Sequence, residues 1–326
     1  MKILVLRFSS IGDIVLTSPV LRGLKEQVPG AEVHVATKAA FADLLRFSPH
    51  VHQVHALHGG DLGDLIDRLK RERFDRVIDL HHNLRTARIK RALGVKAHSF
   101  HKLNIEKWLL VNLRIDRMPR VHIVDRYLAT AAHLGVKNDG RGLELFIPAD
   151  REVGPEALPG SHRAGYVAMA IGAAHATKRL PVHRLVELAA LVPGPLVLIG
   201  GAGDREVAQA IATAVGGRVF DATGRFDLLG SASLIRGARA VIAHDSGAMH
   251  IACAFQRPVV SIWGSTVPLF GMGPYIPLHP ERAHLSEVEG LSCRPCSKIG
   301  FAQCPKGHFH CMERQDLRRI ADLASR

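Results

Sequence analysis

The sequence predicts an α/β protein built from two domains with parallel sheets. Short apolar runs alternate with stretches of helical periodicity throughout the 326-residue chain. This pattern restarts after residues 147–164, a segment rich in Pro, Gly and charge that resembles a linker. One hydrophobic core rarely supports a chain of this length, because cores stop growing at about 250–300 residues. We therefore expect two Rossmann-like domains, residues 1–150 and 151–326, whose sheets face a central cleft.

The first half contains five apolar runs that are short enough to be buried strands. They are Lys2–Arg7, Val33–Thr37, Val51–Leu57, Asp75–His81 and Ala97–His101. Between them, helical periodicity predicts helices at Pro19–Gln27, Ala39–Phe47 and Leu62–Glu72.

The second half repeats this alternation. Its predicted strands are Gly165–Ile171, Pro195–Gly200, Arg218–Asp221, Ala240–His244 and Pro258–Trp263. Its predicted helices are Val182–Leu191, Asp204–Val215, Asp227–Arg236 and Gly247–Ala254. In parallel sheets, ligands bind beyond the carboxyl ends of the strands, so the loops at those ends should carry the chemistry.

The charge balance points to an anionic partner. Lys and Arg number 43 against 30 Asp and Glu, a net charge of +13. Residues 85–126 alone hold eleven basic and three acidic side chains. This basic segment is either a solvated helical face or a docking surface for phosphates or carboxylates.

Composition also excludes several classes of protein. The longest uncharged stretch, Pro258–Pro280, contains five prolines and cannot be a membrane-spanning helix. Met1 runs directly into a strand pattern that Arg7 interrupts, so no signal peptide is expected. We expect a cytoplasmic protein with reduced cysteines. The 17 aromatic residues are few for a nucleic-acid stacking platform.

Small residues follow the first predicted strand. Ser9, Ser10 and Gly12 allow a tight turn into a helix, but a single glycine does not make a dinucleotide-binding fingerprint. Asp13 stands at the opening of that helix. Taken alone, it is either an ordinary N-cap or a functional carboxylate in the cleft.

Two polar clusters follow strands in the second half. Thr177 and Lys178 come after Gly165–Ile171 and suit a phosphate site, although a solvated loop would look similar. The run from Asp245 to His250 comes after Ala240–His244 and combines a helix start with a close-approach glycine. A capping sequence is the alternative there. A Ser–His–Asp hydrolase is not favoured, because the G-x-S-x-G elbow is missing.

Together these motifs resemble glycosyltransferase family 9, the ADP-heptose:lipopolysaccharide heptosyltransferases. The stretch Lys2–Pro19 resembles the family's N-terminal signature, and Thr177-Lys178-Arg179 resembles its donor loop. Leu180 departs from that loop, since an aromatic is common there. Asp245-Ser246-Gly247-x-x-His250 resembles the family's D-[ST]-G-x-x-H element.

The resemblance implies a GT-B fold and an inverting transfer that needs no cofactor and no metal. It implies that Asp13 is the general base and that the donor site comprises Thr177, Lys178, Asp245, Ser246, Gly247 and His250. The implied donor is ADP-heptose. The implied acceptor is an anionic inner-core glycolipid reached at the inner membrane surface, and we expect it to meet Arg85, Arg88 and Arg120 of the basic segment.

Other functions stay open beside this one. A relative that transfers another nucleotide-activated sugar is the nearest alternative. An epimerase of the same fold would need no acceptor and would leave the basic segment unexplained. From a different class, charge alone would also suit a basic nucleic-acid-binding module, although we expect no nucleic-acid partner.

Four cysteines lie near the C-terminus, at positions 293, 296, 304 and 311. A CxxC pair with two further cysteines nearby can build a structural zinc site. The later pair is not a second CxxC, so ordinary thiols are the alternative. Cys253 is expected to be a small core residue.

Overall fold

The structure, a computed structural model, describes residues 1–326. The chain divides into two compact units, the first formed by residues 1–103 and 121–146 and the second by residues 104–120 and 147–326. The sequence placed residues 104–120 in the first domain, whereas in the structure they pack with the second unit. No helix is both long enough and apolar enough to cross a lipid bilayer.

The first unit contains a five-stranded parallel sheet with the order β3-β2-β1-β4-β5. Its strands are β1 (Lys2–Leu6), β2 (Glu32–Lys38), β3 (Gln53–Leu57), β4 (Arg76–Asp79) and β5 (Ala97–Ser99). The central strand β1 pairs with both β2 and β4, and its apolar residues from Ile3 to Leu6 are fully buried. Near-continuous apolar runs are typical of strands that are covered on both faces.

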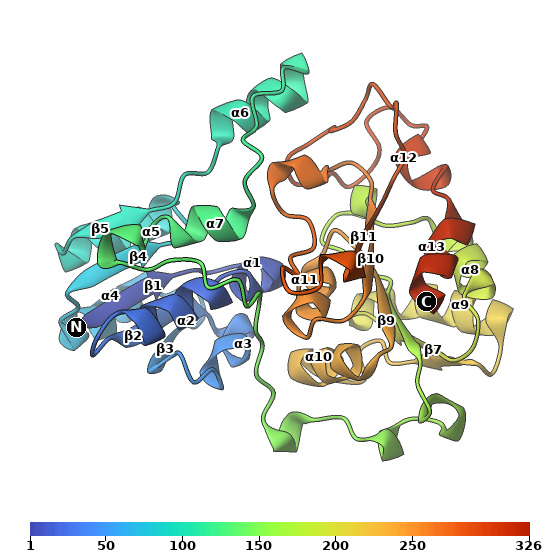
Figure 1. Cartoon of the computed structure of the whole chain (residues 1–326), viewed down its shortest axis with the longest axis horizontal. Helices are drawn as coiled ribbons and strands as arrows, with labels where there is room; N and C mark the ends of the chain where they lie inside the picture. Colours follow the sequence, from blue (N-terminus) through green and yellow to red (C-terminus); the bar gives the residue numbers. More distant parts are fainter. The chain divides into compact units, whose positions relative to one another are not determined.

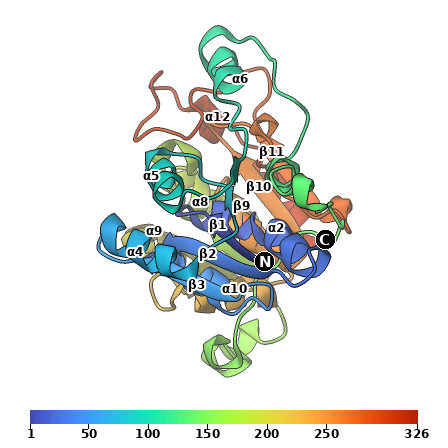
Figure 2. The same cartoon turned by 90° about the vertical axis from the view of Figure 1, so that its left-hand side faces the viewer.

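Helices cover both faces of this sheet. They are α1 (Ile11–Val15), α2 (Ser18–Gln27), α3 (Asp43–Arg46), α4 (Leu62–Glu72), α5 (Leu84–Leu93) and α7 (Ile123–Leu128). Figure 2 shows α4 and α5 on one side of the sheet and α2 on the other. The amphipathic α4 begins at Asp61, whose carboxylate accepts the backbone N–H of Asp64, and it buries Leu65 and Leu69.

The second unit contains a six-stranded parallel sheet with the order β11-β10-β9-β6-β7-β8. Its strands are β6 (Val167–Ala170), β7 (Leu196–Ile199), β8 (Val219–Asp221), β9 (Ala240–His244), β10 (Val259–Trp263) and β11 (Ala283–Glu287). If the six strands from β6 to β11 are renumbered 1 to 6, the order read from β8 is 3-2-1-4-5-6, which is the Rossmann order. The prediction of two parallel-sheet α/β domains is therefore confirmed.

Helices also cover both faces of the second sheet. They are α8 (Val182–Leu191), α9 (Arg205–Val215), α10 (Leu228–Gly237), α11 (Gly247–Ala254), α12 (His310–Glu313) and α13 (Leu317–Ser325). Figure 1 shows α10 and α11 on one side of the sheet and α8, α9 and α13 on the other. Leu317 and Ile320 of α13 join the core of this unit, so the C-terminal residues are an integral part of it.

The segment 104–120 forms α6 (Asn104–Trp108), followed by a π-helical turn at Leu109–Leu113. The predicted linker consists of three short 3-10 turns, Ala149–Arg151, Pro155–Ala157 and Gly160–His162. It is tied to α10, because Arg151 forms an ion pair with Asp227 and the Val153 N–H donates to the Ser233 hydroxyl at 2.9 Å.

Three local predictions need correction. The predicted helix Ala39–Phe47 is a 3-10 turn, Ala39–Phe41, followed by the short α3. The predicted strand Asp75–His81 ends at Asp79, because the Asp79 carboxylate accepts the backbone N–H groups of His81 and His82 and turns the chain. The sequence analysis identified neither β11 nor α13.

Candidate functional site

Each sheet reverses its strand order at one point, between β1 and β4 in the first unit and between β6 and β9 in the second. Chains leave such neighbouring strands in opposite directions, so a crevice opens beyond their carboxyl ends and ligands bind there. Asp13 follows β1, Lys178 follows β6 and Asp245 follows β9. Each unit therefore carries a candidate site, the first-unit site around Asp13 and the second-unit site around Lys178.

In the first-unit site, Asp13 lies within α1 and is held from two directions. Its Oδ1 atom is 2.7 Å from Nη2 of Arg7. Its Oδ2 atom accepts hydrogen bonds from the backbone N–H of Ser10 at 3.0 Å and from the Ser10 hydroxyl at 2.9 Å. The N-cap of α1 is Ser10, so Asp13 bonds back to the cap and is not the cap itself. The carboxylate is fixed in orientation while its side chain stays 20% exposed.

Arg7 is the buried partner of Asp13, and the sequence analysis gave it no role in the site. Its Nε atom donates to the Ser9 carbonyl at 2.7 Å, and Nη1 donates to the Tyr127 hydroxyl at 2.8 Å and to the Leu80 carbonyl. A lone arginine directly after an apolar strand is the signal that could have identified it, because a buried charge requires partners. Arg7 is therefore a rigid support for the carboxylate.

The end of β4 brings His81 to the same site. Its imidazole packs edge-on against Phe8, with ring centroids 5.8 Å apart, and its buried Nδ1 atom has no hydrogen-bond partner. Burial, together with the positive charges of Arg7 and Lys102, lowers the pKa of His81 to about 4. His81 is therefore a neutral imidazole at neutral pH.

The three predicted acceptor-binding arginines are divided between the two units. Arg85 and Arg88 lie in the first turns of α5, where Arg88 is exposed and the Arg85 guanidinium stacks 5.2 Å from the Phe8 ring centre. Arg120 belongs to the second unit and pairs with Asp116 at 2.7 Å. Within the basic segment, Lys90 has a structural role, since it pairs with the buried Asp79 at 2.7 Å.

The second-unit site joins the loops that follow β6 and β9. Lys178 Nζ is 2.6 Å from Oδ2 of Asp245, and the Thr266 hydroxyl donates to the same oxygen at 2.7 Å. Ala170 and Ala243 are register partners near the ends of the two strands, which explains why the loops meet. Two residues that were predicted from separate motifs thus form one ion pair.

Thr177, predicted to bind the donor, precedes Lys178 and is buried. Its hydroxyl is buried, accepts from the Phe301 N–H at 2.8 Å and from the Ser265 hydroxyl at 2.9 Å, and donates to the Phe301 carbonyl at 3.2 Å. The Thr177 hydroxyl therefore makes its hydrogen bonds within the protein. Thr177 therefore positions the Lys178 loop.

The helix α11 begins directly beside the ion pair. Ser246 is its N-cap, yet the Ser246 hydroxyl makes no capping bond and has no hydrogen-bond partner. Gly247 is the first helical residue, and His250 is buried on the inner face of the helix. The N-terminal N–H groups of such a helix favour a bound anion.

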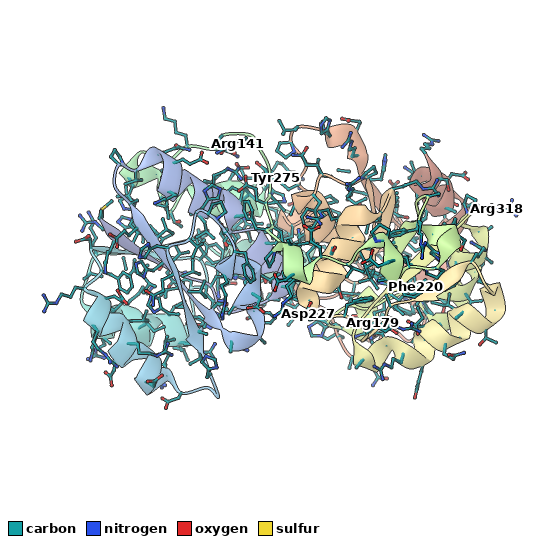
Figure 3. The ribbon with its side chains drawn as sticks, turned by 90° about the horizontal axis from the view of Figure 1, so that it is seen from below. Arg141, Arg179, Phe220, Asp227, Tyr275 and Arg318 are labelled. Carbon is teal, nitrogen blue, oxygen red and sulfur yellow. The ribbon has the colours of Figure 1, made fainter.

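A second ion pair flanks the donor loop. Arg179, labelled in Figure 3, donates to the Ala173 carbonyl at 2.6 Å and to Oδ1 of Asp204 at 3.1 Å. A Cβ atom on Gly172 would lie 2.6 Å from Oδ2 of Asp204, so a larger residue there would displace the Asp204 side chain. Arg179 was predicted only as part of the donor-loop motif, and its pairing with Asp204 was not.

The four C-terminal cysteines form no disulfide. No three of their thiols lie within 4.8 Å of one another, and the Cys296 thiol instead donates to the Cys293 carbonyl at 3.0 Å. Burial raises the pKa of Cys296 to about 11 and that of Cys311 to about 12, so both are thiols at neutral pH. Cys253 is buried in α11, as predicted.

Comparison with known proteins agrees with the motif analysis. The sequence family described as glycosyltransferase family 9 (heptosyltransferase) matches residues 62–303. The lipopolysaccharide heptosyltransferase 2 of Escherichia coli strain K12 is 26% identical over 294 residues, which cover 83% of this chain and 84% of the relative.

Two solved structures show the fold. The E. coli ADP-heptose lipopolysaccharide heptosyltransferase II matches with a TM-score of 0.74 and 22% identity, over 99% of this chain and 97% of its own. The E. coli heptosyltransferase WaaC, solved with ADP, matches with a TM-score of 0.68 and 21% identity, over 87% of this chain and 92% of its own. The predicted GT-B fold is confirmed.

Proposed function

Because the chain belongs to glycosyltransferase family 9, we propose that this glycosyltransferase moves a heptose from ADP-heptose to an inner-core acceptor of lipopolysaccharide, with inversion at the anomeric carbon. Support for the sugar and the acceptor comes from the heptosyltransferase relative, and support for the nucleotide comes from the similar structure solved with ADP. The single observation that carries the chemistry is the oriented carboxylate of Asp13.

In this mechanism, Asp13 removes a proton from the acceptor hydroxyl. The hydroxyl oxygen forms a bond to the anomeric carbon of the heptose from the face opposite the leaving group. The bond between that carbon and the β-phosphate oxygen breaks, and ADP leaves with the electron pair. A base must hold its oxygen within hydrogen-bond reach of the proton, and the contacts from Arg7 and Ser10 fix the orientation that this requires.

Lys178 and the N-terminus of α11 stabilise the leaving diphosphate in the proposed reaction. Negative charge grows on ADP in the transition state, and preorganised cations and N–H dipoles lower its free energy most when they need not move. The 2.6 Å contact with Asp245 holds the Lys178 ammonium in place before the donor binds. The unpartnered Ser246 hydroxyl is a further donor for a phosphate oxygen.

For the acceptor, we propose contacts with Arg85 and Arg88. An inner-core acceptor is a membrane-anchored glycolipid that bears carboxylates and phosphates, so the enzyme would work at the cytoplasmic face of the inner membrane. Arg120 is the weaker candidate for an acceptor contact, because its guanidinium already pairs with Asp116.

The direct test of the base is Asp13→Asn, which keeps the shape of the side chain and removes its basicity. We expect turnover to fall by about 10²–10⁴-fold, the usual contribution of a general base. Affinity for ADP should not change, because the donor site lies in the other unit. The matched control is Asp43→Asn in the neighbouring short helix α3, which should keep wild-type turnover. Wild-type turnover in Asp13→Asn would disprove the assignment.

The nearest alternative is the transfer of another nucleotide-activated sugar. A thermal-shift screen with ADP, UDP, GDP and CDP distinguishes the two, because only a bound ligand raises the melting temperature. A rise with ADP alone is the expected result. Charge was the sole basis for a nucleic-acid-binding module, and the proposed anionic acceptor would account for that charge equally well.

A further inference from the structure

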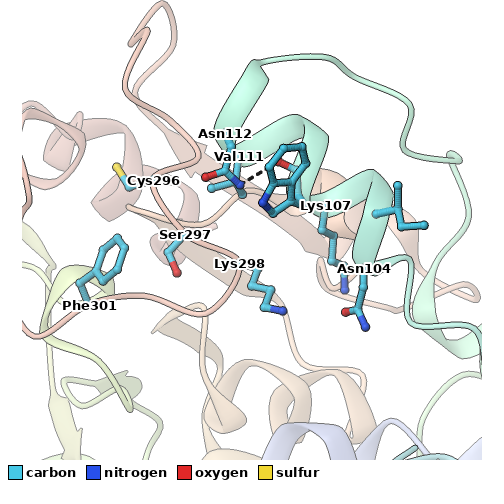
Figure 4. A pocket seen from close by; sticks show the side chains of 10 residues that line it. Asn104, Lys107, Val111, Asn112, Cys296, Ser297, Lys298 and Phe301 are labelled. Carbon is cyan, nitrogen blue, oxygen red and sulfur yellow. Dashed lines mark hydrogen bonds between the residues drawn. The ribbon is translucent and has the colours of Figure 1, made fainter.

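The second unit contains a cavity of about 580 Å³ that belongs to neither candidate site. It lies between α6 with its π-helical continuation and residues 296–301, segments that are far apart in the sequence (Figure 4). Its lining combines apolar and cationic side chains, among them Ile105, Trp108, Val111, Phe301, Lys107 and Lys298. We call residues 104–120 and 291–309 the α6 patch.

The α6 patch exposes an unusual share of apolar surface. Fourteen large hydrophobic side chains of the chain are exposed, and six of them lie between residues 105 and 115 or at 299 and 301. Ile105 is 73% exposed and Trp108 is 56% exposed. Scattered exposed hydrophobics need no explanation, but three of these six, Ile105, Trp108 and Phe301, line one cavity, which indicates a binding surface.

The α6 patch also carries a net positive charge, and hydrogen bonds join its two segments. It contains seven basic and two acidic side chains. Arg114 joins the two segments, donating to the Pro295 carbonyl at 2.6 Å and to the Cys293 carbonyl at 3.2 Å. The Lys107 ammonium lies 5.8 Å from the Phe270 ring centre, within the same unit.

We propose that the α6 patch docks the enzyme on an anionic lipid bilayer. Tryptophan and aliphatic side chains next to lysine and arginine are the combination that binds membrane interfaces, since the apolar groups enter the acyl boundary and the cations meet the headgroup phosphates. The positive charge of the patch complements an anionic bilayer and not a neutral one. This inference rests on the proposed function, because a glycolipid acceptor requires the enzyme to reach a bilayer.

The test is sedimentation with vesicles of phosphatidylethanolamine and phosphatidylglycerol, and with vesicles of phosphatidylcholine alone. Wild-type protein should bind the anionic vesicles preferentially. Ile105→Ser/Trp108→Ser should lower the binding at least about tenfold, because it removes two interfacial anchors. Lys107→Glu/Lys298→Glu should abolish the preference for anionic lipid. The control Val182→Ser/Leu278→Ser alters two exposed apolar side chains of the same unit and should bind normally.

Several outcomes would overturn the proposal. One is absent or lipid-independent binding of the wild type. Another is unchanged binding by the Ile105/Trp108 variant while its melting temperature shows that it is folded. A third is a dimer that this variant dissolves, which would make the patch a subunit interface. Transfer to a deacylated, water-soluble acceptor keeps the two proposals separate, because docking variants should retain it and a failure of the proposed function would abolish it in the wild type.

An independent observation concerns a histidine cluster in the first unit. Glu32 and His34 of β2 and His52 before β3 present ligand atoms that lie within 4.8 Å of one another. His34 is fully buried, and its Nδ1 atom is 3.0 Å from Nε2 of His55. Its Nε2 atom has no hydrogen-bond partner and lies 3.9 Å from the Glu32 carboxylate.

We infer that Glu32, His34 and His52 bind a divalent transition metal ion of the zinc class. A metal-binding imidazole characteristically donates its other N–H to a nearby acceptor, and the contact between His34 Nδ1 and His55 supplies that arrangement in the tautomer that carries the proton on His34 Nδ1. It leaves a buried lone pair on Nε2 directed at Glu32. Two imidazoles and a carboxylate suit Zn²⁺ with a water as the fourth ligand. Without the ion, Lys2 neutralises this region, at 3.9 Å from Glu32.

Titration with Co²⁺ and Zn²⁺ tests this site without any activity assay. One ion per chain with the visible absorption of tetrahedral cobalt is expected, and His52→Ala should abolish it. His52 is exposed, so the variant should fold. The control is the exposed neighbour His58→Ala, which should bind as the wild type does. Cobalt binding that His52→Ala retains, or no binding by the wild type, would overturn the inference.

Discussion

Each candidate site holds a charged side chain in place through an ion pair, and the side chains held in the two sites carry opposite charges. In the first unit, a buried arginine fixes an accessible carboxylate, with 2.7 Å between Arg7 and Asp13. In the second unit, a carboxylate fixes an ammonium group, with 2.6 Å between Asp245 and Lys178. Both pairs stand beyond the carboxyl ends of central strands in the same type of sheet. In both units the fold holds an oriented charged side chain beyond the strand ends, and in the proposed mechanism the carboxylate removes a proton while the ammonium stabilises the leaving group.

Beyond Asp13 itself, the largest effect should come from Lys178→Ala. It removes the cation that acts on charge developing in the transition state, so we expect turnover to fall by about 10²–10³-fold. Affinity for ADP should weaken in parallel, which isothermal titration measures. Asp245→Asn should cost less, since the ammonium remains and loses only its anchor. Equal losses in the two variants would mean that the ion pair acts as a unit, and the comparison between the sites would fail.

Lowering the pH should destabilise the first unit more than the second. Burial lowers the pKa of His55 and His81 in the first unit, and of His244 in the second, to about 4. Unfolded histidine has a pKa of about 6.5, so the unfolded chain binds protons that the folded chain does not. The free energy of unfolding should therefore fall as the pH drops from about 6.5 to about 4. The first unit, with more such histidines, should unfold first.

The two tryptophans, Trp108 and Trp263, make this test possible, because both belong to the second unit. In chelator-containing buffer, circular dichroism should change at a higher pH than tryptophan fluorescence does. His55→Gln should move the first transition to lower pH, whereas the exposed control His58→Gln should not. Coincident transitions in the wild type would show that acid does not distinguish the units.

The smallest effect concerns the acceptor. Arg88→Glu/Arg91→Glu reverses two exposed cations of α5, and we expect the acceptor KM to rise about threefold to tenfold and donor affinity to stay unchanged. The wild-type acceptor KM should also rise with ionic strength, because salt screens exposed charges. Wild-type kinetics in this double variant would make the basic face of α5 a solvated surface.

Much of the fold could be predicted from local patterns. The helix Leu62–Glu72 and the strand Ala240–His244 agree with the structure residue for residue, because their periodicity and apolar runs are unambiguous. The strand β11 could not be predicted in this way, because its sequence Ala-His-Leu-Ser-Glu has no apolar run and it buries only Ser286 at the edge of the sheet. The packing of residues 104–120 with the second unit could not be predicted either, because it depends on tertiary contacts such as those from Arg114 to residues 293 and 295.

For the sites, the sequence could indicate which loops carry chemistry and not how their side chains pair. Lys178 and Asp245 were each predicted from a motif, but their contact follows from the pairing of β6 with β9. Thr177 was predicted from its motif as a donor-binding hydroxyl, but its hydrogen bond with Phe301 joins residues 124 positions apart and could not be predicted from the sequence. Arg7 has no motif of its own, because its importance lies in a three-dimensional contact with Asp13.

The most direct test of the proposed function is the anomeric configuration of the product. The purified enzyme is incubated with ADP-heptose and an inner-core lipopolysaccharide acceptor, and the new glycosidic linkage is analysed by NMR. The account predicts one heptose per acceptor, with the configuration at its anomeric carbon opposite to that in the donor, and release of ADP. A product that retains the donor's configuration, or ADP binding without any transfer to this acceptor, would contradict it.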